Sequence, residues 1–458
     1  MEKRLPNNWS ETKFANLISF VIGGDWGYDS EKVIEDSSLV YCIRGGEIRD
    51  WNKNKGNTAA LRRLKNTSIE KRKLNKGDIL VEISGGGPDQ PVGRTLYIDE
   101  DSINNKFLYP TVCTNFFRLV RTVKPVDSKY INYYLHYFYI IGGTIELQGG
   151  SNNLRNLKFK EYQQITIPLP PLAEQKRIAD KLDILFGRLE TIRKATDHIP
   201  ELIKKIRQQI LTYAVTGKLT EEWRREKKSN KWKSELASQC CQKVQSGGTP
   251  KGGQFENSGI PFLKVYNIVQ NKINFEYEPQ YVSTEIQNSQ IKKSIVYPGD
   301  VVMNIVGPPL NKVAIIPDIY PEWNINQAIT LFRTKDYLDN RYLYYFFCEG
   351  SPVNSLINQT RGVVGQVNIS LSQCRNFMIT IPPIEEQKEI ISRVQSLFEK
   401  VDIIEQRYQT LKTKLENLPQ ALLYKAFKGE LVEQLPTDGN AVDLLREIEQ
   451  LKKMTKKK

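Results

Sequence analysis

Residues 49–76 combine positive charge with asparagines in a pattern suited to contacting nucleic acid. Ten lysines and arginines lie in this stretch against Asp50 and Glu70, with asparagines between them. Arginine can read the edge of guanine and asparagine the edge of adenine, whereas lysine mainly neutralises phosphate. The candidate DNA-binding residues here are Arg49, Arg62, Arg63, Lys65 and Arg72, with Arg44 just before them. A solvated charged loop would have the same composition, so both interpretations remain open.

Further candidate cations lie beside glycine-rich segments, where the backbone can approach a phosphate closely. Arg94 follows the sequence Pro-Val-Gly, Arg155 follows a glycine-rich loop, and Lys251 lies beside a Gly-Gly-Thr-Pro turn. In the second half of the chain the remaining candidates are Lys264, Lys312 and Arg361. By local pattern, Arg94 corresponds to Lys312, and the loop of Arg155 to that of Arg361. A plain flexible turn is the alternative interpretation near Lys251.

The chain as a whole is basic. Its 66 lysines and arginines exceed the 52 aspartates and glutamates, which gives a formal net charge of +14 over 458 residues. Such an excess predicts an anionic partner, most often nucleic acid, although a merely soluble basic protein has the same balance. The sequence has no apolar run of about 18 residues and no apolar signal core near its start. We therefore expect a cytoplasmic protein with no membrane span.

Residue types that would perform catalysis are sparse or wrongly spaced. The six cysteines include no C-x-x-C pair and the only histidines are His136 and His198, so we expect no metal site. None of the Pro-Pro pairs has the flanking residues of an adenine methyltransferase motif. Gly217-Lys218 lacks the glycine spacing of a P-loop, and the acidic residues form no cluster suited to Mg²⁺. We expect the isolated chain to have no catalytic residues and no cofactor.

An internal repeat organises the elements that must position these candidates. The sequence ITIPLPPLAEQKRI, which begins at Ile165, recurs as MITIPPIEEQKEI, which ends at Ile390. Pro383 lies 212 residues after Pro171, and the same offset aligns Glu174 with Glu386 and, farther on, Gly217 with Gly429. A register held over this distance without a gap indicates a duplicated unit.

Each copy continues as an amphipathic helix with heptad spacing of apolar residues. Steps of four and three run through residues 178–210 in the first copy and 390–422 in the second. So narrow a stripe predicts a coiled coil, with an amphipathic helix packed on a globular core as the alternative. We expect Pro200 and Pro419 to kink or restart the helices. The residues expected to pair the helices or to bind partner subunits are Leu182, Leu185, Leu189, Ile192, Val394, Leu397, Val401 and Ile404.

The segments before the two helices resemble each other more weakly. Both open with a tryptophan, Trp9 and Trp232, and both contain a Gly-Asp turn. The Phe-Arg pair at Arg118 aligns with the pair at Arg333, and the glycine pair 23–24 with the pair 247–248. Short β-branched and aromatic runs bounded by glycine and proline predict strands, while tyrosine-rich stretches predict helices. Each segment is therefore expected to fold as a mixed α/β domain.

The predicted fold class is α+β, with two mixed α/β domains separated by two long helices that form an antiparallel coiled coil. Antiparallel pairing follows from the short polar linker between Gly217 and Trp232, and from the start of helix two directly after the second domain. The two domains would then lie at opposite ends of the helix pair, related by a pseudo-two-fold axis. The expected boundaries are 1–165 for the first domain, 166–231 for the first helical region and linker, 232–375 for the second domain, and 376–458 for the second helical region and basic tail.

The repeated motifs resemble one known family. The sequence is similar to the specificity subunits of Type I restriction–modification enzymes in Pro-Pro-Leu-Ala-Glu-Gln at residues 170–175, Pro-Pro-Ile-Glu-Glu-Gln at 382–387 and Ser-Gly-Gly-Thr-Pro at 246–250. The resemblance covers nearly the whole chain. The first domain departs from it, because Gly-Gly-Asp-Trp at residues 23–26 replaces the fuller Gly-Gly-Thr-Pro.

This resemblance implies a non-catalytic, sequence-specific DNA-binding subunit with two target-recognition domains, each reading one half of a bipartite site in double-stranded DNA. The helical regions would set the spacer and bind two modification subunits, which hold S-adenosylmethionine and methylate adenine. Restriction subunits would add translocase and nuclease activity with ATP and Mg²⁺. The alternative is a coiled-coil scaffold that binds RNA or another polyanion, and a less favoured possibility is an enzyme with an unrecognised site.

Overall fold

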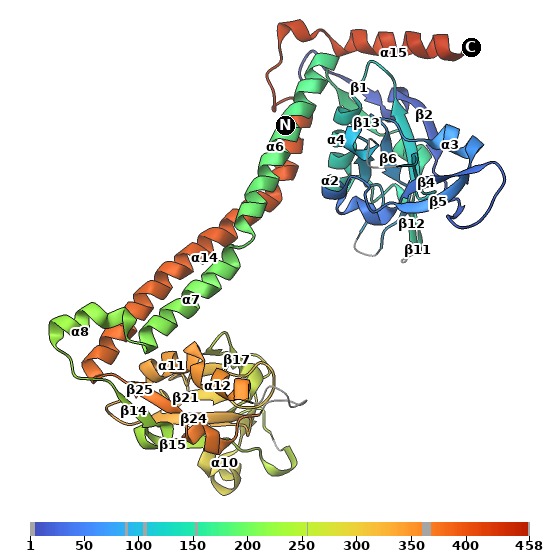
Figure 1. The fold of residues 1–458 in the computed structure, drawn as a ribbon. Coiled ribbons are helices and arrows are strands. Elements are labelled where there is room, and N and C mark those ends of the chain that lie inside the picture. The colour runs from blue at the N-terminus through green and yellow to red at the C-terminus, as the bar shows by residue number, and fades with distance from the viewer. Residues whose placement is uncertain are drawn as a thin grey trace. The chain divides into compact units, whose positions relative to one another are not determined.

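The computed structural model describes residues 5–87, 90–103, 108–151, 154–253, 255–359 and 368–456. The chain divides into two compact units, of which the first comprises residues 1–196 and 411–458 and the second comprises residues 197–410. Each unit contains one globular domain and its own segments of long helix, which can be followed by colour in Figure 1. The duplication predicted from the sequence is thus visible in the folded chain.

The globular domain of the first unit is built on two four-stranded sheets. One sheet has the order β2-β10-β6-β8 and is antiparallel throughout. The other has the order β3-β5-β4-β9, and its last two strands run parallel. The strands are β2 (Ile18–Gly23), β3 (Tyr28–Asp29), β4 (Ser37–Ile43), β5 (Ala60–Lys65), β6 (Ile79–Glu82), β8 (Thr95–Tyr97), β9 (Thr111–Cys113) and β10 (Phe117–Thr122).

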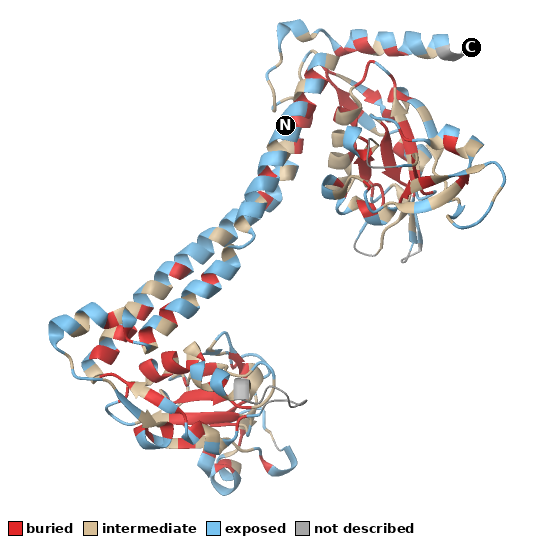
Figure 2. Cartoon of the chain, in the orientation of Figure 1, coloured by how far each residue is buried: buried red, intermediate tan, exposed pale blue. Residues whose placement is uncertain are grey.

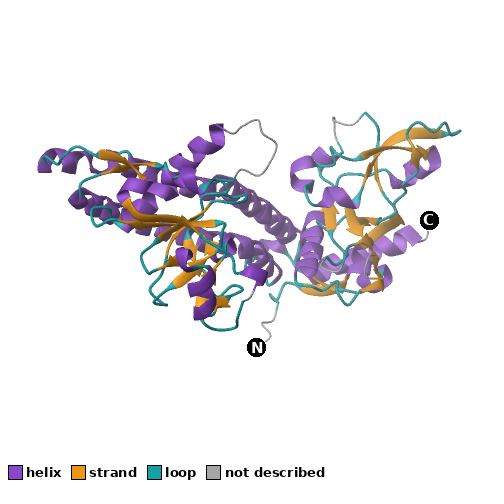
Figure 3. Ribbon diagram, turned by 90° about the horizontal axis from the view of Figure 1, so that it is seen from below, coloured by secondary structure: helices purple, strands orange, loops and turns teal. Residues whose placement is uncertain are grey.

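The second unit repeats this plan. Its antiparallel sheet has the order β15-β24-β21-β22, and its mixed sheet has the order β19-β16-β23-β20 with a parallel β16–β23 pair. The strands are β15 (Cys241–Ser246), β16 (Ile260–Leu263), β19 (Tyr281–Val282), β20 (Ile295–Val296), β21 (Val301–Asn304), β22 (Val313–Ile315), β23 (Trp323–Ile325) and β24 (Ile329–Thr334). Figure 3 shows these strands gathered within each domain and helices packed around them.

An ion pair that recurs in both domains corrects one alignment made from the sequence. The side chain of Arg121 donates to Asp78 (Nε to Oδ1, 2.8 Å), and Arg333 donates to Asp300 over the same distance. Arg333 therefore corresponds to Arg121 in the folded chain, and the alignment with Arg118 is wrong. The sequence Leu-Val-Arg-Thr that ends β10 matches Leu-Phe-Arg-Thr in β24, and the preceding Phe-Phe-Arg had obscured this register.

A short two-stranded sheet joins each domain to its helix. In the first unit β1 (Ser10–Lys13) pairs with β13 (Thr166–Leu169). In the second unit β14 (Lys233–Leu236) pairs with β25 (Met378–Ile381). Residues just beyond the expected domain limits at 165 and 375 thus form a strand of each domain, and the long helices begin only after the Pro-Pro pairs.

The long helices are α6 (Leu172–Thr196), α7 (Ile199–Val215) and α14 (Ile384–Phe427). Pro200 occupies the first turn of α7, directly after the break that separates α7 from α6, so the expected restart is confirmed there. Pro419 lies inside α14, which continues past it. The C-terminal segment ends in a further helix, α15 (Ala441–Lys456).

The helices pair antiparallel inside each unit. In the first unit Arg193 donates to the carbonyl of Leu415 at 3.0 Å, whereas Arg177, about four helix turns earlier, donates to the backbone carbonyl of Glu433. In the second unit Arg207 bonds Asp402 and Glu405, and Arg393 donates to the carbonyl of Leu219. Residue numbers rise along one helix as they fall along the other. The coiled-coil interpretation and its antiparallel direction are confirmed.

Burial along the seam separates the predicted helix-pairing residues into two groups. Leu182, Leu189, Val394 and Val401 are buried, and Leu185 and Leu397 are half-buried. Ile192 and Ile404, in contrast, are 42% and 48% exposed. These two isoleucines occupy the same position of the repeat, and their partial exposure leaves apolar surface that suits contact with a partner subunit, the second role expected for this set. Figure 2 shows the buried residues concentrated in the sheets and along one stripe of the helices.

Candidate nucleic-acid interface

In both domains the glycine pair forms a turn after the first strand of the antiparallel sheet. The backbone of this turn lies in close contact with the backbone that follows β9 or β23 of the mixed sheet. A Cβ built on Gly24 would lie 2.1 Å from the carbonyl oxygen of Thr114, and one built on Gly247 would lie 2.0 Å from that of Asn326. Only glycine permits this approach. Gly24 and Gly247 are therefore equivalent, which moves the sequence alignment of the two glycine pairs by one residue.

Arg44 and Lys264 occupy the same place beside these turns. Arg44 directly follows β4, which runs parallel to β9, and Lys264 directly follows β16, which runs parallel to β23. The carbonyl at the end of that strand accepts from Thr114 N in the first domain and from Asn326 N in the second, both at 3.0 Å. Two cations chosen independently from the sequence thus lie at one equivalent position of the fold.

Arg94 and Lys312 form a second equivalent pair, as the local sequence pattern predicted. The carbonyl oxygen of Arg94 accepts from Glu82 N at 2.9 Å, and that of Lys312 accepts from Asn304 N at 3.1 Å. Both residues directly precede the edge strand of their antiparallel sheet, β8 or β22.

Buried carboxylates hold both arginines of the first domain. Arg44 donates from Nε and Nη2 to Glu47 at 3.0 and 2.7 Å. Arg94 donates from Nε to Oε2 of Glu82 at 2.9 Å and from Nη2 to Oε1 at 2.5 Å. The two glutamate side chains are each 2% exposed, whereas the arginine side chains are 48% and 21% exposed. The arginines therefore cover carboxylates that water does not reach.

The two ion pairs are neighbours. A Cβ built on Gly45, between Arg44 and Glu47, would lie 3.8 Å from Oε1 of Glu82. Hydrogen bonding to Glu82 raises the pKa of the Arg94 guanidinium. Arg155 belongs to the same region, because it lies opposite Gly85 in the pairing of β12 (Leu154–Leu157) with β7 (Ser84–Gly85). The structure thus brings Arg44, Arg94 and Arg155 together.

The second domain has amides where the first has carboxylates. Asn267 takes the place of Glu47, since its Oδ1 accepts from Lys264 N at 2.9 Å. Asn304 takes the place of Glu82, four residues after the Gly-Asp turn in each domain. Both asparagines are buried, at 1% and 0% exposed. Sequence reasoning followed the cations and missed these acceptors. The shared offset from the turn could have identified Glu82 and Asn304, and the position three residues after Arg44 and Lys264 could have identified Glu47 and Asn267.

Arg62 and Arg63 lie on β5, in the other sheet of the first domain. The guanidinium of Arg62 lies 4.2 Å from the ring centroid of Trp26 and pairs with Asp29, so its side chain is only 14% exposed. Arg63 donates to the carbonyl of Ser30 at 3.3 Å. Lys65 ends the strand with its side chain exposed. These contacts give the two arginines a structural role whatever else they bind.

The other candidates are spread over the surface. Arg72 donates from Nε to the carbonyl of Gly23 at 2.9 Å and so braces the glycine turn. Arg49 and Lys251 are exposed, and the backbone N–H of Lys251 donates to Gln290. Arg361 lies outside the described residues. The structure therefore divides the other eleven sequence candidates between the Arg44–Arg94 region, its counterpart in the second domain, and separate surface positions.

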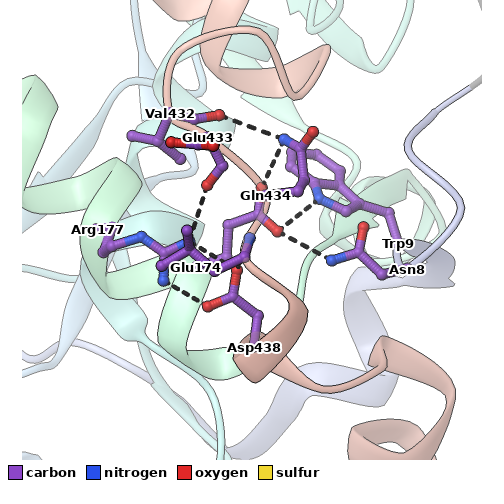
Figure 4. A network of polar contacts seen from close by, with 9 residues as sticks. Asn8, Trp9, Glu174, Arg177, Val432, Glu433, Gln434 and Asp438 are labelled. Atoms are coloured by element: carbon purple, nitrogen blue, oxygen red, sulfur yellow. Dashed lines mark hydrogen bonds and ion pairs between the residues drawn. The ribbon is translucent and has the colours of Figure 1, made fainter.

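The glutamates of the Pro-Pro motifs form a second kind of polar site at the junction of each domain with its helices. In Figure 4, Glu174 accepts from Trp9 Nε1 at 3.0 Å and from Gln434 Nε2 at 3.0 Å. One turn along α6, Arg177 pairs with Asp438. Glu174 is fully buried, so it ties the start of the domain and the C-terminal segment to the first turn of α6.

Glu386 repeats this junction in the second unit. It accepts from Trp232 Nε1 at 2.9 Å and from Thr220 Oγ1 and Arg224 Nε, both at 2.8 Å. It is likewise fully buried. The segment that follows α7 therefore packs on the second domain as the segment that follows α14 packs on the first. Each junction joins a domain entry, a helix start and the end of the antiparallel helix.

Among the residues that the structure describes, no group of three or more His, Cys, Asp or Glu side chains could hold a metal ion. No helix within the described ranges is both long enough and apolar enough to cross a membrane.

Comparison with known proteins agrees with this architecture. Residues 50–201 and 231–413 match the family model of the Type I restriction modification DNA specificity domain. The Type I restriction enzyme EcoKI specificity subunit of Escherichia coli K12 is 28% identical over 94% of this chain and 91% of its own length. The StySPI specificity subunit of Salmonella potsdam is 25% identical over 94% of this chain and 91% of its own length.

A solved structure has the same fold. The HsdS subunit from Thermoanaerobacter tengcongensis superposes with a TM-score of 0.63 over 94% of this chain and 99% of its own, at 17% sequence identity. The family model matches the greater part of the chain and includes both repeats. This chain therefore belongs to the family of Type I restriction–modification DNA specificity subunits.

Proposed function

We propose that the chain is the DNA-reading subunit of a Type I restriction–modification complex, in which each globular domain reads one half of a bipartite duplex site. It carries no catalytic residues of its own. Two modification subunits supply S-adenosylmethionine and methylate adenine, and restriction subunits add ATP- and Mg²⁺-dependent cleavage. The DNA-reading role is supported by family membership and by the cations that recur at equivalent positions of both domains.

The observation that supports two copies of one partner is a set of exposed apolar side chains on the helices that recurs in both units. In the first unit Ile192 and Leu418 are 42% and 39% exposed, and in the second unit Ile404 and Ile206 are 48% and 44% exposed. The repeat offset of 212 residues relates Ile192 to Ile404 and Ile206 to Leu418. Exposed apolar side chains at the same repeat positions in each unit fit one copy of the same subunit per unit.

The experiment measures the mass of the complex formed between this chain and its modification subunit. Ile192→Asp should remove one of the two modification subunits, and Ile404→Asp should remove the other. The double variant should bind neither, because each aspartate places a charge in an apolar contact. Ile184→Asp is the matched control, since Ile184 is 52% exposed on the same helix but its repeat counterpart is Ser396.

Native mass spectrometry of the four complexes gives the stoichiometry directly. Complexes with two, one, one and zero modification subunits for the wild type, the two single variants and the double variant would support the proposal. A double variant that still binds two copies would contradict it. In the complete complex, affinity that depends on duplex sequence at fixed salt would distinguish DNA reading from general binding of a polyanion.

A further inference from the structure

We propose that Arg94, held by the buried Glu82, reads a guanine in the first half-site, and that Lys312 at the equivalent position of the second domain contacts phosphate instead. The inference rests on the proposed DNA-reading function and assigns different roles to one position in the two domains. Under it, Arg94 is a specificity-determining residue and Glu82 is a positioning residue that acts through it.

The bond geometry leaves Arg94 suited to base reading. A guanidinium has five N–H donors in one plane. Glu82 takes the edge formed by Nε and Nη2, through bonds of 2.9 and 2.5 Å. The opposite edge, formed by the two terminal nitrogens, has the spacing of the O6 and N7 acceptors of guanine. The neighbouring amide of Gln90 is on an exposed residue, so a ligand can displace it from this edge.

The charge balance favours a base over a phosphate. Glu82 neutralises Arg94 and is itself 2% exposed, so the pair carries little net charge toward a polyanion. A phosphate contact draws its strength from net charge and counterion release. Hydrogen-bond reading depends instead on a rigidly held donor, which the two bonds to Glu82 provide. The ion pair therefore holds the guanidinium in a fixed orientation but has little net charge with which to attract a phosphate.

The second domain lacks this arrangement at the same position. Asn304 is fully buried, and its Oδ1 accepts from the backbone N–H of Lys312 at 2.7 Å while its Nδ2 donates to the carbonyl of Pro309 at 2.9 Å. Asn304 therefore fixes the backbone of the loop between Pro309 and Lys312, and its amide is not used to hold the ammonium group of Lys312. Because Asn304 and not a carboxylate occupies this position, the charge of Lys312 is not neutralised there. Its ammonium group is a point charge on a flexible side chain, which suits contact with phosphate.

The ion pair of Asp78 with Arg121 supplies a matched control. It has the same two-bond geometry, at 2.8 and 3.2 Å, with side-chain exposures of 2% and 29%. The second domain repeats it as Asp300 with Arg333. An ion pair shared by both domains belongs to the scaffold, so its loss should change stability without changing base preference.

The test measures affinity of the assembled complex for its duplex site, for first-half-site variants in which each guanine is replaced in turn, and for non-specific duplex, each over a range of salt. Arg94→Ala should reduce discrimination at one guanine by roughly 5- to 150-fold, the equivalent of about 1–3 kcal/mol. The salt slope should stay unchanged. Lys312→Ala should instead weaken binding to all sequences and lower the salt slope by about one.

Glu82→Gln gives the sharpest result, because it frees the charge of Arg94 while loosening its geometry. Discrimination at that guanine should fall while affinity for non-specific duplex rises. Asp78→Asn should leave both quantities unchanged and lower only the unfolding temperature.

Three outcomes would overturn the inference. These are a reduced salt slope with intact discrimination in Arg94→Ala, a Glu82→Gln variant that behaves like Asp78→Asn, or a Lys312→Ala variant that changes base preference. A wild-type complex with no sequence preference would instead contradict the proposed function itself.

Discussion

The indole N–H of Trp9 donates to the carboxylate of Glu174 at 3.0 Å, across 165 residues of sequence. Trp9 begins the first domain, and Glu174 lies in the first turn of the helix that leaves it. Trp232 and Glu386 repeat this relationship in the second unit at 2.9 Å. Each domain is thereby fixed to its own helix by a bond between its entry and its exit.

Trp232→Phe tests the importance of this bond for stability. Phenylalanine keeps an aromatic side chain but lacks the indole N–H, so Glu386 loses one donor while it stays buried beside Arg224. A hydrogen bond to a charged group contributes about 1.5–3 kcal/mol, so the free energy of unfolding of the second unit should fall by about that amount. The free energy of unfolding of each unit is measured by urea unfolding, with hydrogen exchange as the probe that distinguishes the units. The first unit, which keeps its own bond between Trp9 and Glu174, is the internal control, and equal stabilities of Trp232→Phe and wild type would refute the prediction.

The Asp438–Arg177 pair predicts a pH dependence for the docking of the C-terminal segment. The guanidinium of Arg177 lowers the pKa of the Asp438 carboxyl from its ordinary value of 3.8. A carboxyl whose pKa is lowered on folding stabilises the folded state above its unfolded pKa, and this contribution is lost as the pH falls through the folded pKa.

Asp438→Asn should therefore destabilise the docked segment at pH 7, and its difference from wild type should shrink below about pH 4. The stability of the docked segment in the variant and the wild type is compared by hydrogen exchange of α15 and of the preceding loop, at pH 7 and again near pH 3. A difference that stays constant over this range would show that the ion pair does not control docking.

The antiparallel helices predict how the two half-sites are spaced. Arg193 and Leu415 lie at the same level of the helix pair in the first unit, so one heptad inserted beside each residue preserves the seam. Seven residues add about 10 Å of helix, or about three base pairs of duplex. The preferred non-specific spacer should lengthen accordingly, although rotation around the duplex weakens binding. The preferred spacer length is measured by selecting bound duplexes from a library with randomised spacers. An unchanged spacer length with intact specific binding would show that the helices do not set the distance between the half-sites.

Periodicity and repetition were sufficient to predict much of this fold. The heptads of residues 178–210 and 390–422 predicted the paired helices, because apolar spacing records which face is buried. The local pattern around Arg94 also identified Lys312 correctly. The pairing of side chains was harder to predict. Arg118 and Arg121 both follow apolar residues, and the bond from Arg121 to Asp78 shows which of them corresponds to Arg333.

The sequence did not reveal which contacts the candidate site residues make within the domain. Arg62 stands in a basic run typical of DNA contacts, yet it packs on Trp26 and pairs with Asp29. Charge alone did not predict a role for Glu82, because a carboxylate repels the phosphates of DNA, yet the bonds from Arg94 to Glu82 fix the guanidinium in place. Exposure of Ile192 was equally unpredictable, since a heptad position does not reveal whether the partner helix covers it.

The most direct test of the account is the methylation pattern produced by the complex. The chain is expressed with its modification subunits in a host free of other adenine methylation, and modified bases are mapped by single-molecule sequencing. We expect methylated adenine in both halves of one bipartite motif with a fixed non-specific spacer, and Arg94→Ala should relax only the first half. Methylation at a contiguous motif, or without any sequence preference, would contradict the central claim that two repeated domains each read one half-site.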